Sequence, residues 1–191
     1  VDGLGLFGKE AMGAKHLTLH CSESFAALIE NNPPWHELRK QEVIAPNTWT
    51  SNESFEPSPG CGFTINPIPV PHRDELSDNH ALLIEGGGGN LLFLPDHDSW
   101  SETLRGSTIR KWLTELNVDI ALLDGTFWDA DELPHRDLSE IPHPTVRESL
   151  EMLGERKERD PDIRFLHLNH TNPLCNPSSP EAAELASMGW A

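Results

Sequence analysis

The sequence predicts an α/β layered domain, because in its second half short apolar segments with strand-like patterning alternate with segments of helical spacing. Its 191 residues suffice for one hydrophobic core, and neither an internal repeat nor a clean domain boundary interrupts them. A hydrophobic fraction of 37% and a charged fraction of 24% are typical of a globular chain. We therefore treat residues 1–191 as a single domain.

The first third of the chain predicts one helix between two short strands. Ser22 or Ser24 is a suitable N-cap for the helix, and Pro33-Pro34 should end it because proline cannot donate the next backbone hydrogen bond. Proline and glycine punctuate residues 36–60, so we expect mostly loop there. The predicted elements are a strand over 17–20, a helix over 22–32 and a strand near 43–44.

The remainder predicts alternating strands and helices. The glycine run Gly86–Gly89 joins two apolar segments and is read as a hairpin turn. It is not read as a phosphate-binding loop, because no strand–GxGxxG–helix context surrounds it. The expected strands cover residues 63–70, 81–85, 90–96, 118–127 and 163–169, and the expected helices cover 108–117, 144–157 and 181–189.

Composition excludes several functions. The formal net charge of −17 would repel a phosphate backbone, so we expect no nucleic-acid partner. No apolar run approaches the roughly 20 residues of a membrane helix, so we expect no membrane association. Three cysteines without CxxC spacing argue against a disulfide framework and favour a cytoplasmic location.

Three side chains that can bind metal follow strand-like segments. They are His72 after residues 63–70, Asp96 after residues 90–95, and His170 after residues 163–169. The ends of strands in layered sheets converge on a cleft, and imidazole and carboxylate groups are ligands of zinc and iron. Spacing alone leaves other roles open. His72 could be an ordinary loop residue, Asp96 could form a turn, and His170 could cap a helix.

The order of the motifs resembles the metallo-β-lactamase superfamily, in the branch with transfer-RNA 3′-processing ribonucleases and coenzyme PQQ synthesis protein B. The resemblance rests on Gly3-Leu4 and on the strings HLTLHCSESFAALIE, VPHRDELSDNHALLIE, LLFLPDHDSW, ALLDGTF and FLHLNHTNP. Within the branch, VPHRDELSD, LFLPDHDSW, LLDGTFWDADELPHRDLSEIPHP and HLNHTNP are most similar to the PQQ synthesis B family. The similarity extends over roughly residues 1–190.

The resemblance implies the fold and the site. The fold would be a metallo-β-lactamase-like αβ/βα sandwich that is N-terminally incomplete, with residues 1–191 forming its C-terminal two-thirds, because the HxHxDH motif would precede Val1. The implied cofactor is a divalent metal, zinc or iron. The implied metal ligands are His72, Asp96 and His170; the catalytic groups are Asp98 and His167; and the groups lining or supporting the cleft are Arg73, Asp74, Asp78 and Asp124.

The resemblance also implies a function, namely a metal-dependent enzyme of PQQ biosynthesis that oxidatively modifies a peptide-derived precursor. A metal-dependent hydrolase and a non-catalytic carrier are the alternatives, because the fold alone does not select the reaction. The expected partner is a small-molecule or peptide-derived substrate. Half of a two-sheet sandwich would leave an apolar face uncovered, which favours a homo-oligomer. We expect His80 and His97 at the surface.

Overall fold

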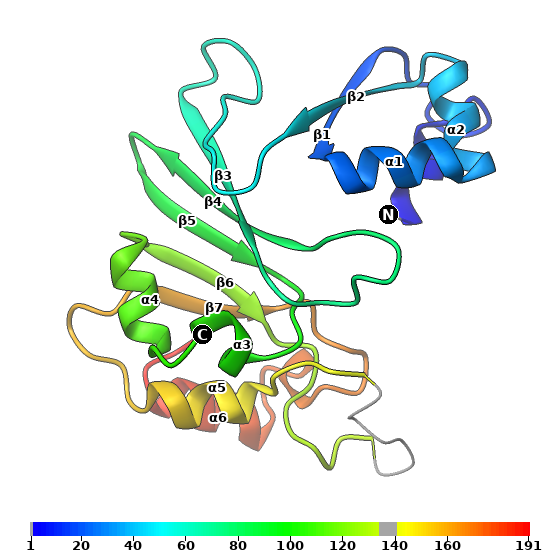
Figure 1. The fold of residues 1–191 in the computed structure, drawn as a ribbon. Coiled ribbons are helices and arrows are strands. Elements are labelled where there is room, and N and C mark those ends of the chain that lie inside the picture. Colours follow the sequence, from blue (N-terminus) through cyan, green and yellow to red (C-terminus); the bar gives the residue numbers. More distant parts are fainter. Residues whose placement is uncertain (1, 134–140) are drawn as a thin grey trace.

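The computed structural model describes residues 2–133 and 141–191. Its centre is a five-stranded mixed sheet in the order β3-β4-β5-β6-β7 (Figure 1). β3, β4 and β5 are antiparallel neighbours, whereas β5, β6 and β7 run parallel to one another. The strands are β3 (Phe63–Pro69), β4 (His80–Gly86), β5 (Gly89–Leu94), β6 (Ile120–Asp124) and β7 (Asp162–Leu166).

Four helices pack on one face of this sheet (Figure 1). They are α3 (Trp100–Leu104), α4 (Ile109–Glu115), α5 (Val146–Leu153) and α6 (Pro180–Ser187). Alternate residues of the strands point to these helices, as the period of two requires, and they are almost completely buried. Leu92, Leu94, Ala121, Leu123 and Ile163 form the sheet side of this core.

The opposite face of the sheet is less covered. Leu82 pairs with Phe93 and Ile84 with Leu91, and these four side chains are only partly buried. On β6, the side chain of Ile120 is 37% exposed. One face of the sheet therefore forms the main core, and the other keeps an apolar surface of intermediate exposure.

A smaller unit contains the N-terminal elements. β1 (Leu17–Ser22) and β2 (Ile44–Trp49) form a parallel pair, and α1 (Glu23–Asn31) and α2 (Pro33–Lys40) pack beside it (Figure 1). A short 3₁₀ helix, η1 (Asp2–Phe7), precedes them, and a second one, η3 (Pro173–Cys175), lies near the C-terminus. Ile29, Val43 and Ile44 form a separate hydrophobic cluster in this unit.

The predicted elements are confirmed in kind and order, but several ends differ: the strands expected over 118–127 and 163–169 are Ile120–Asp124 and Asp162–Leu166, and the strand expected near 43–44 extends to Trp49. Three further differences concern the helices. The prediction of a loop from residue 36 is wrong for residues 36–40, which belong to a second helix that Asn32 caps. Pro33 and Pro34 lie in its first turn, where a backbone N–H donor is not needed. The prediction missed α3, which Ser99 caps. The helix expected over 144–157 ends at Leu153, where Gly154 has φ +62°.

The hairpin turn and the state of the cysteines can also be compared with the predictions. Gly86 pairs with Gly89 across the β4–β5 hairpin, which confirms the turn. Cys21, Cys61 and Cys175 are all free thiols, as the absence of a disulfide framework requires. Within the described ranges, no helix combines the length and the apolar character needed to cross a membrane.

Candidate metal centre

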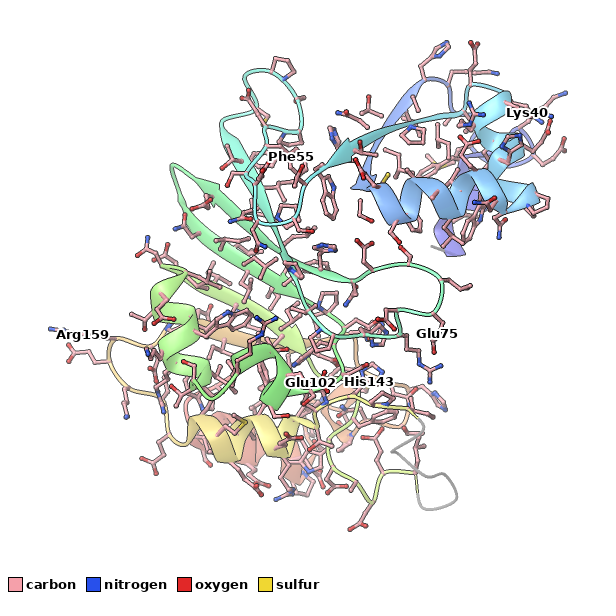
Figure 2. The ribbon with its side chains drawn as sticks, viewed as in Figure 1. Lys40, Phe55, Glu75, Glu102, His143 and Arg159 are labelled. Carbon is pink, nitrogen blue, oxygen red and sulfur yellow. The ribbon has the colours of Figure 1, made fainter. Side chains whose placement is uncertain are left out.

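Histidine and aspartate side chains gather at the edge of the sheet where the parallel strands end. Asp96 follows β5, Asp124 is the last residue of β6, and His167 follows β7. His72 follows the antiparallel β3, and His143 lies in the segment that enters α5. Figure 2 shows His143 beyond the ends toward which β5 and β6 run. The topology thus brings together residues that are up to 95 positions apart in the sequence.

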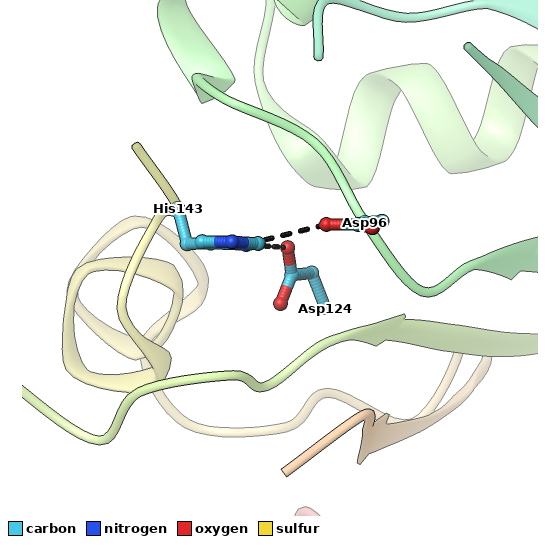
Figure 3. Close-up of side chains that lie close together, drawn as sticks. All are labelled: Asp96, Asp124 and His143. Atoms are coloured by element: carbon cyan, nitrogen blue, oxygen red, sulfur yellow. Dashed lines mark hydrogen bonds and ion pairs between the residues drawn. The ribbon is translucent and has the colours of Figure 1, made fainter. Parts of the chain in front are cut away.

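Asp96, Asp124 and His143 form the centre of this group (Figure 3). His143 Nδ1 lies 2.8 Å from Asp124 Oδ2 and 3.5 Å from Asp96 Oδ1. One potential ligand atom from each residue lies within 4.8 Å of the other two, and within residues 2–133 and 141–191 no other such cluster of three is found. This arrangement can hold a metal ion.

Asp124 is the most buried carboxylate of the site, with 1% exposure. Its Oδ1 accepts hydrogen bonds from the backbone N–H of Thr126 at 2.9 Å and from the Thr126 hydroxyl at 2.8 Å. Its Oδ2 accepts from the His97 backbone N–H at 3.1 Å and from the His143 ring. Burial raises the pKa of Asp124, but these hydrogen bonds outweigh it and hold the pKa below its ordinary value.

His143 is the partner of Asp124. Burial lowers the pKa of His143, but the hydrogen bond to Asp124 and the negative charges of Asp124, Asp96 and Asp98 outweigh burial and raise the pKa. The opposite directions of the two pKa changes favour a protonated imidazole beside an ionised carboxylate. This pair can supply a proton to a bound substrate.

His72 connects the site to Asp98. Its Nδ1 lies 2.8 Å from Asp98 Oδ1, so the N–H of this ring is directed to Asp98 and Nε2 is left toward Asp96. His72 Nε2 is 3.2 Å from Asp96 Oδ1, yet that buried oxygen makes no hydrogen bond. Two ligands of a tetrahedral zinc ion, each bonded at about 2.0 Å, lie about 3.3 Å apart. The spacing and the unpaired oxygen therefore fit a divalent metal.

The structure does not bring all the expected ligands together. His72 and Asp96 meet as expected, and Asp98 and Asp124 support them. His170 is exposed and belongs to no cluster of three ligands among the described residues. Its role as a ligand stays a prediction, because β7 ends at Leu166 rather than continuing to Asn169.

His167 lies beside the metal centre, next to Thr126 and close to His143. Its Nδ1 is 3.0 Å from the Thr126 hydroxyl oxygen, and its ring centroid is 6.4 Å from that of His143. The Thr126 hydroxyl already donates to Asp124, so it accepts from His167 Nδ1. In the neutral tautomer that this hydrogen bond selects, Nδ1 carries the hydrogen and Nε2 can coordinate a metal.

Three residues expected to line the cleft lie on the β3–β4 loop. Arg73 and Asp74 are exposed there. Asp78 accepts a short hydrogen bond from Ser22 and faces the N-terminal unit, where it lines a cavity of about 230 Å³ together with Trp49. Asp78 therefore connects the loop to the N-terminal unit rather than to the metal centre. Part of the similarity string around residues 134–140 lies outside the described residues.

The sequence reasoning missed two histidines of the site. His143 precedes Pro144 and the helix cap Thr145, and this position at a helix entry was the available signal. His97 was expected at the surface, and this is wrong: it is completely buried, with its ring 4.4 Å from that of Trp100. Burial lowers the pKa of His97 to about 4, so the ring is neutral at pH 7. No sequence signal marked this position.

The mixed sheet with helices on one face and a His/Asp cluster at its strand ends is the arrangement of a metallo-β-lactamase fold, and the comparisons with known proteins show this fold. Residues 3–160 match the family described as the beta-lactamase superfamily domain, and the chain belongs to this family. Two solved structures share the fold. Zinc-bound PqqB from Methylobacterium extorquens has a TM-score of 0.70 and 22% identity, covering 100% of this chain and 66% of its own. YhfI from Bacillus subtilis, a metallo-β-lactamase fold protein, has a TM-score of 0.55 and 15% identity, covering 88% and 60%.

Among curated proteins, the chain is similar to coenzyme PQQ synthesis protein B from several bacteria. The protein from Methylorubrum extorquens (strain PA1) is 24% identical over 190 residues, which cover 91% of this chain and 61% of the relative. The protein from Pseudomonas syringae pv. syringae is 35% identical over 148 residues, which cover 67% and 46%. The chain thus spans about half to three fifths of the length of these relatives.

Proposed function

We propose that the chain carries the metal site of a metal-dependent enzyme of PQQ biosynthesis that acts on a small-molecule or peptide-derived substrate. The observation that carries the metal is the unpaired, buried Oδ1 of Asp96, which faces His72 Nε2 at 3.2 Å and His143 Nδ1 at 3.5 Å. Asp96 and His72 would hold the ion, with residues 1–191 acting as one domain. A bound divalent metal would polarise a substrate oxygen and lower the pKa of a bound water.

The third ligand in this proposal is His167 rather than His170. The hydrogen bond to Thr126 fixes the N–H of His167 on Nδ1 and leaves Nε2 free to coordinate. Both histidines are exposed, but His170 lies three residues further from the end of β7. His167 therefore changes from the expected proton carrier to a ligand.

His143 is the proposed proton donor. Asp124 engages its Nδ1, so the ring presents Nε2, and the raised pKa favours its protonated form. Asp124 is itself held by Thr126 and by the His97 backbone, so the imidazole is oriented rather than mobile. Asp98 orients His72 in the same way on the other side of Asp96.

The pathway assignment rests on the relatives. Several bacterial proteins named coenzyme PQQ synthesis protein B match the chain, and a family match together with a PqqB-like fold supports the same setting. A divalent cofactor, zinc or iron, is compatible with the mixture of nitrogen and oxygen donors. Oxidative modification of a peptide-derived precursor is the reaction that we propose first.

A metal-dependent hydrolase is the second candidate. The pairing of His143 with Asp124 favours it, because a protonated imidazole beside a metal site can protonate a leaving group during hydrolysis. The oxidative reaction instead requires a redox-active ion with open positions. The same residues thus serve both reactions, and the metal decides between them.

Parallel reconstitution with zinc(II) and with iron(II) tests the proposal. Oxygen consumption with a Glu/Tyr-derived peptide in the iron protein supports the oxidative function, whereas hydrolysis of an activated phosphodiester in the zinc protein supports the hydrolase. At saturating metal concentration, His143→Gln should still hold the ion, although less tightly because His143 lies beside the ligand Asp96, and it should lose turnover. If both preparations bind stoichiometric metal and neither shows turnover, the protein is a metal-binding carrier rather than an enzyme.

A further inference from the structure

We propose that a buried hydrogen bond between Trp100 and Ser149 positions His143 relative to Asp96. This inference rests on the proposed function, because it concerns the geometry of the same metal centre. The indole N–H of Trp100 donates to the Ser149 hydroxyl at 2.8 Å, and the two residues have 1% and 0% exposure. Neither side chain belongs to the metal centre itself. Both are positioning residues.

One end of this bond belongs to the segment that carries Asp96. Trp100 begins α3 directly after residues 96–99, and its ring contacts His97 edge to face. This segment is held independently on two sides. The Asp98 backbone N–H donates to the Pro71 carbonyl at 2.7 Å, and the His97 backbone N–H donates to Asp124. Trp100 is therefore attached to a segment whose position is already fixed by Pro71 and Asp124.

The other end belongs to the first turns of α5, which follow His143. The Ser149 hydroxyl donates to the Thr145 carbonyl at 3.1 Å, so the serine connects Trp100 to the cap of this helix. Thr145 is two residues after His143. The helix start is also held by backbone N–H groups of Val146 and Arg147, which donate to residues 127 and 128. Those two bonds attach α5 to the segment after β6. Among the hydrogen bonds of residues 2–133 and 141–191, only the Trp100 bond joins α5 to the segment after β5.

This geometry gives the bond a specific consequence. The two halves of the metal centre, Asp96 after β5 and His143 before α5, lie 3.5 Å apart without a hydrogen bond of their own between them. The Trp100–Ser149 bond lies behind them and joins the two segments directly. Loss of the indole donor would leave the buried Ser149 oxygen with only its bond to the Thr145 carbonyl and would free α5 to shift away from α3. His143 would move with it.

The chain offers a matched control for the test. Trp190 is 4% exposed, and its indole N–H donates to the Gly154 carbonyl at 2.8 Å, beyond the other end of α5. Trp100→Phe and Trp190→Phe therefore each remove one indole N–H donor that bonds to α5 or to the residue just after it, and both bonds are 2.8 Å long. Only the first bond connects the two segments of the metal centre. Ser149→Ala removes the same contact from the opposite side.

Cobalt(II) binding measures the effect. The metal-free proteins are titrated with cobalt(II) against a chromophoric chelator, and the visible spectrum reports the coordination geometry. We expect Trp100→Phe and Ser149→Ala to weaken cobalt binding about tenfold or more and to alter the spectrum, as loss of outer supports does at other metal sites. The double variant should be no weaker than either single variant. Trp190→Phe should keep the wild-type affinity and spectrum.

Two results would overturn the inference: wild-type cobalt binding in Trp100→Phe, or equal weakening in Trp190→Phe, which would indicate general destabilisation. If Trp100→Phe does not fold, Ser149→Ala decides. If the wild-type protein takes up no cobalt, the proposed function fails, and nuclear Overhauser contacts in the metal-free protein decide the inference instead. The contact between the His143 and His72 rings, whose centroids are 5.5 Å apart, should be lost in Trp100→Phe and kept in Trp190→Phe.

Discussion

His97→Phe should make the protein more resistant to acid. His97 is completely buried, and neither ring nitrogen has a hydrogen-bond partner. Burial lowers its pKa from 6.5 to about 4, although the charge of Asp124 opposes this. The unfolded chain therefore binds more protons than the folded one between these two pH values, and stability falls as the pH drops through that window. At about 1.4 kcal/mol for each tenfold change in proton affinity, the loss is about 3 kcal/mol.

Urea unfolding of the wild type and the variant, followed by tryptophan fluorescence from pH 7.5 to pH 4, measures this difference. The stability of His97→Phe relative to the wild type should rise by about 3 kcal/mol between pH 7 and pH 4. The raised pKa of His143 affects stability in a different pH range. Its stabilising contribution is complete below pH 6.5 and is lost as the pH rises through the raised pKa. Parallel stability profiles for the two proteins would refute the reasoning.

Three further predictions concern the site and the core. Asp124→Asn should reduce the unfolding free energy at pH 7 by about 3–5 kcal/mol, because it breaks a buried charged pair; a urea midpoint unchanged from wild type would contradict this. Leu123→Ala should cost about 2–5 kcal/mol by the same assay, whereas Leu76→Ala, at a position with 75% exposure, should cost under about 0.5 kcal/mol. His167→Ala should weaken zinc binding in a chelator competition and His170→Ala should not; the reverse order would restore His170 as the ligand.

Much of the fold follows from local sequence patterns. The alternation in β3 and the apolar runs of β4, β5 and β6 each predict a strand, because a strand in a layered sheet buries side chains with a period of two or on both faces. The short helices were harder. α3 has only five residues, and its Trp100 is buried by tertiary packing rather than by any helical repeat. α2 was missed because prolines that end one helix also begin the next.

The site was predictable only where ligands directly follow strands. Asp96 and His72 could be assigned in this way, because strand ends converge at one edge of the sheet. His143 could not, because a segment outside the sheet carries it and only the packing of α5 brings it to Asp124. His167 and His170 are separated by three residues, and the sequence alone does not show where β7 ends.

Zinc content after equilibrium dialysis tests the central claim most directly. The claim is that Asp96 holds a divalent metal at the edge where β5, β6 and β7 end. The wild-type protein should retain stoichiometric zinc, Asp96→Asn should lose it, and Asp78→Asn, at an acidic position that faces the N-terminal unit, should retain it. Zinc retained at wild-type level by Asp96→Asn would contradict the account.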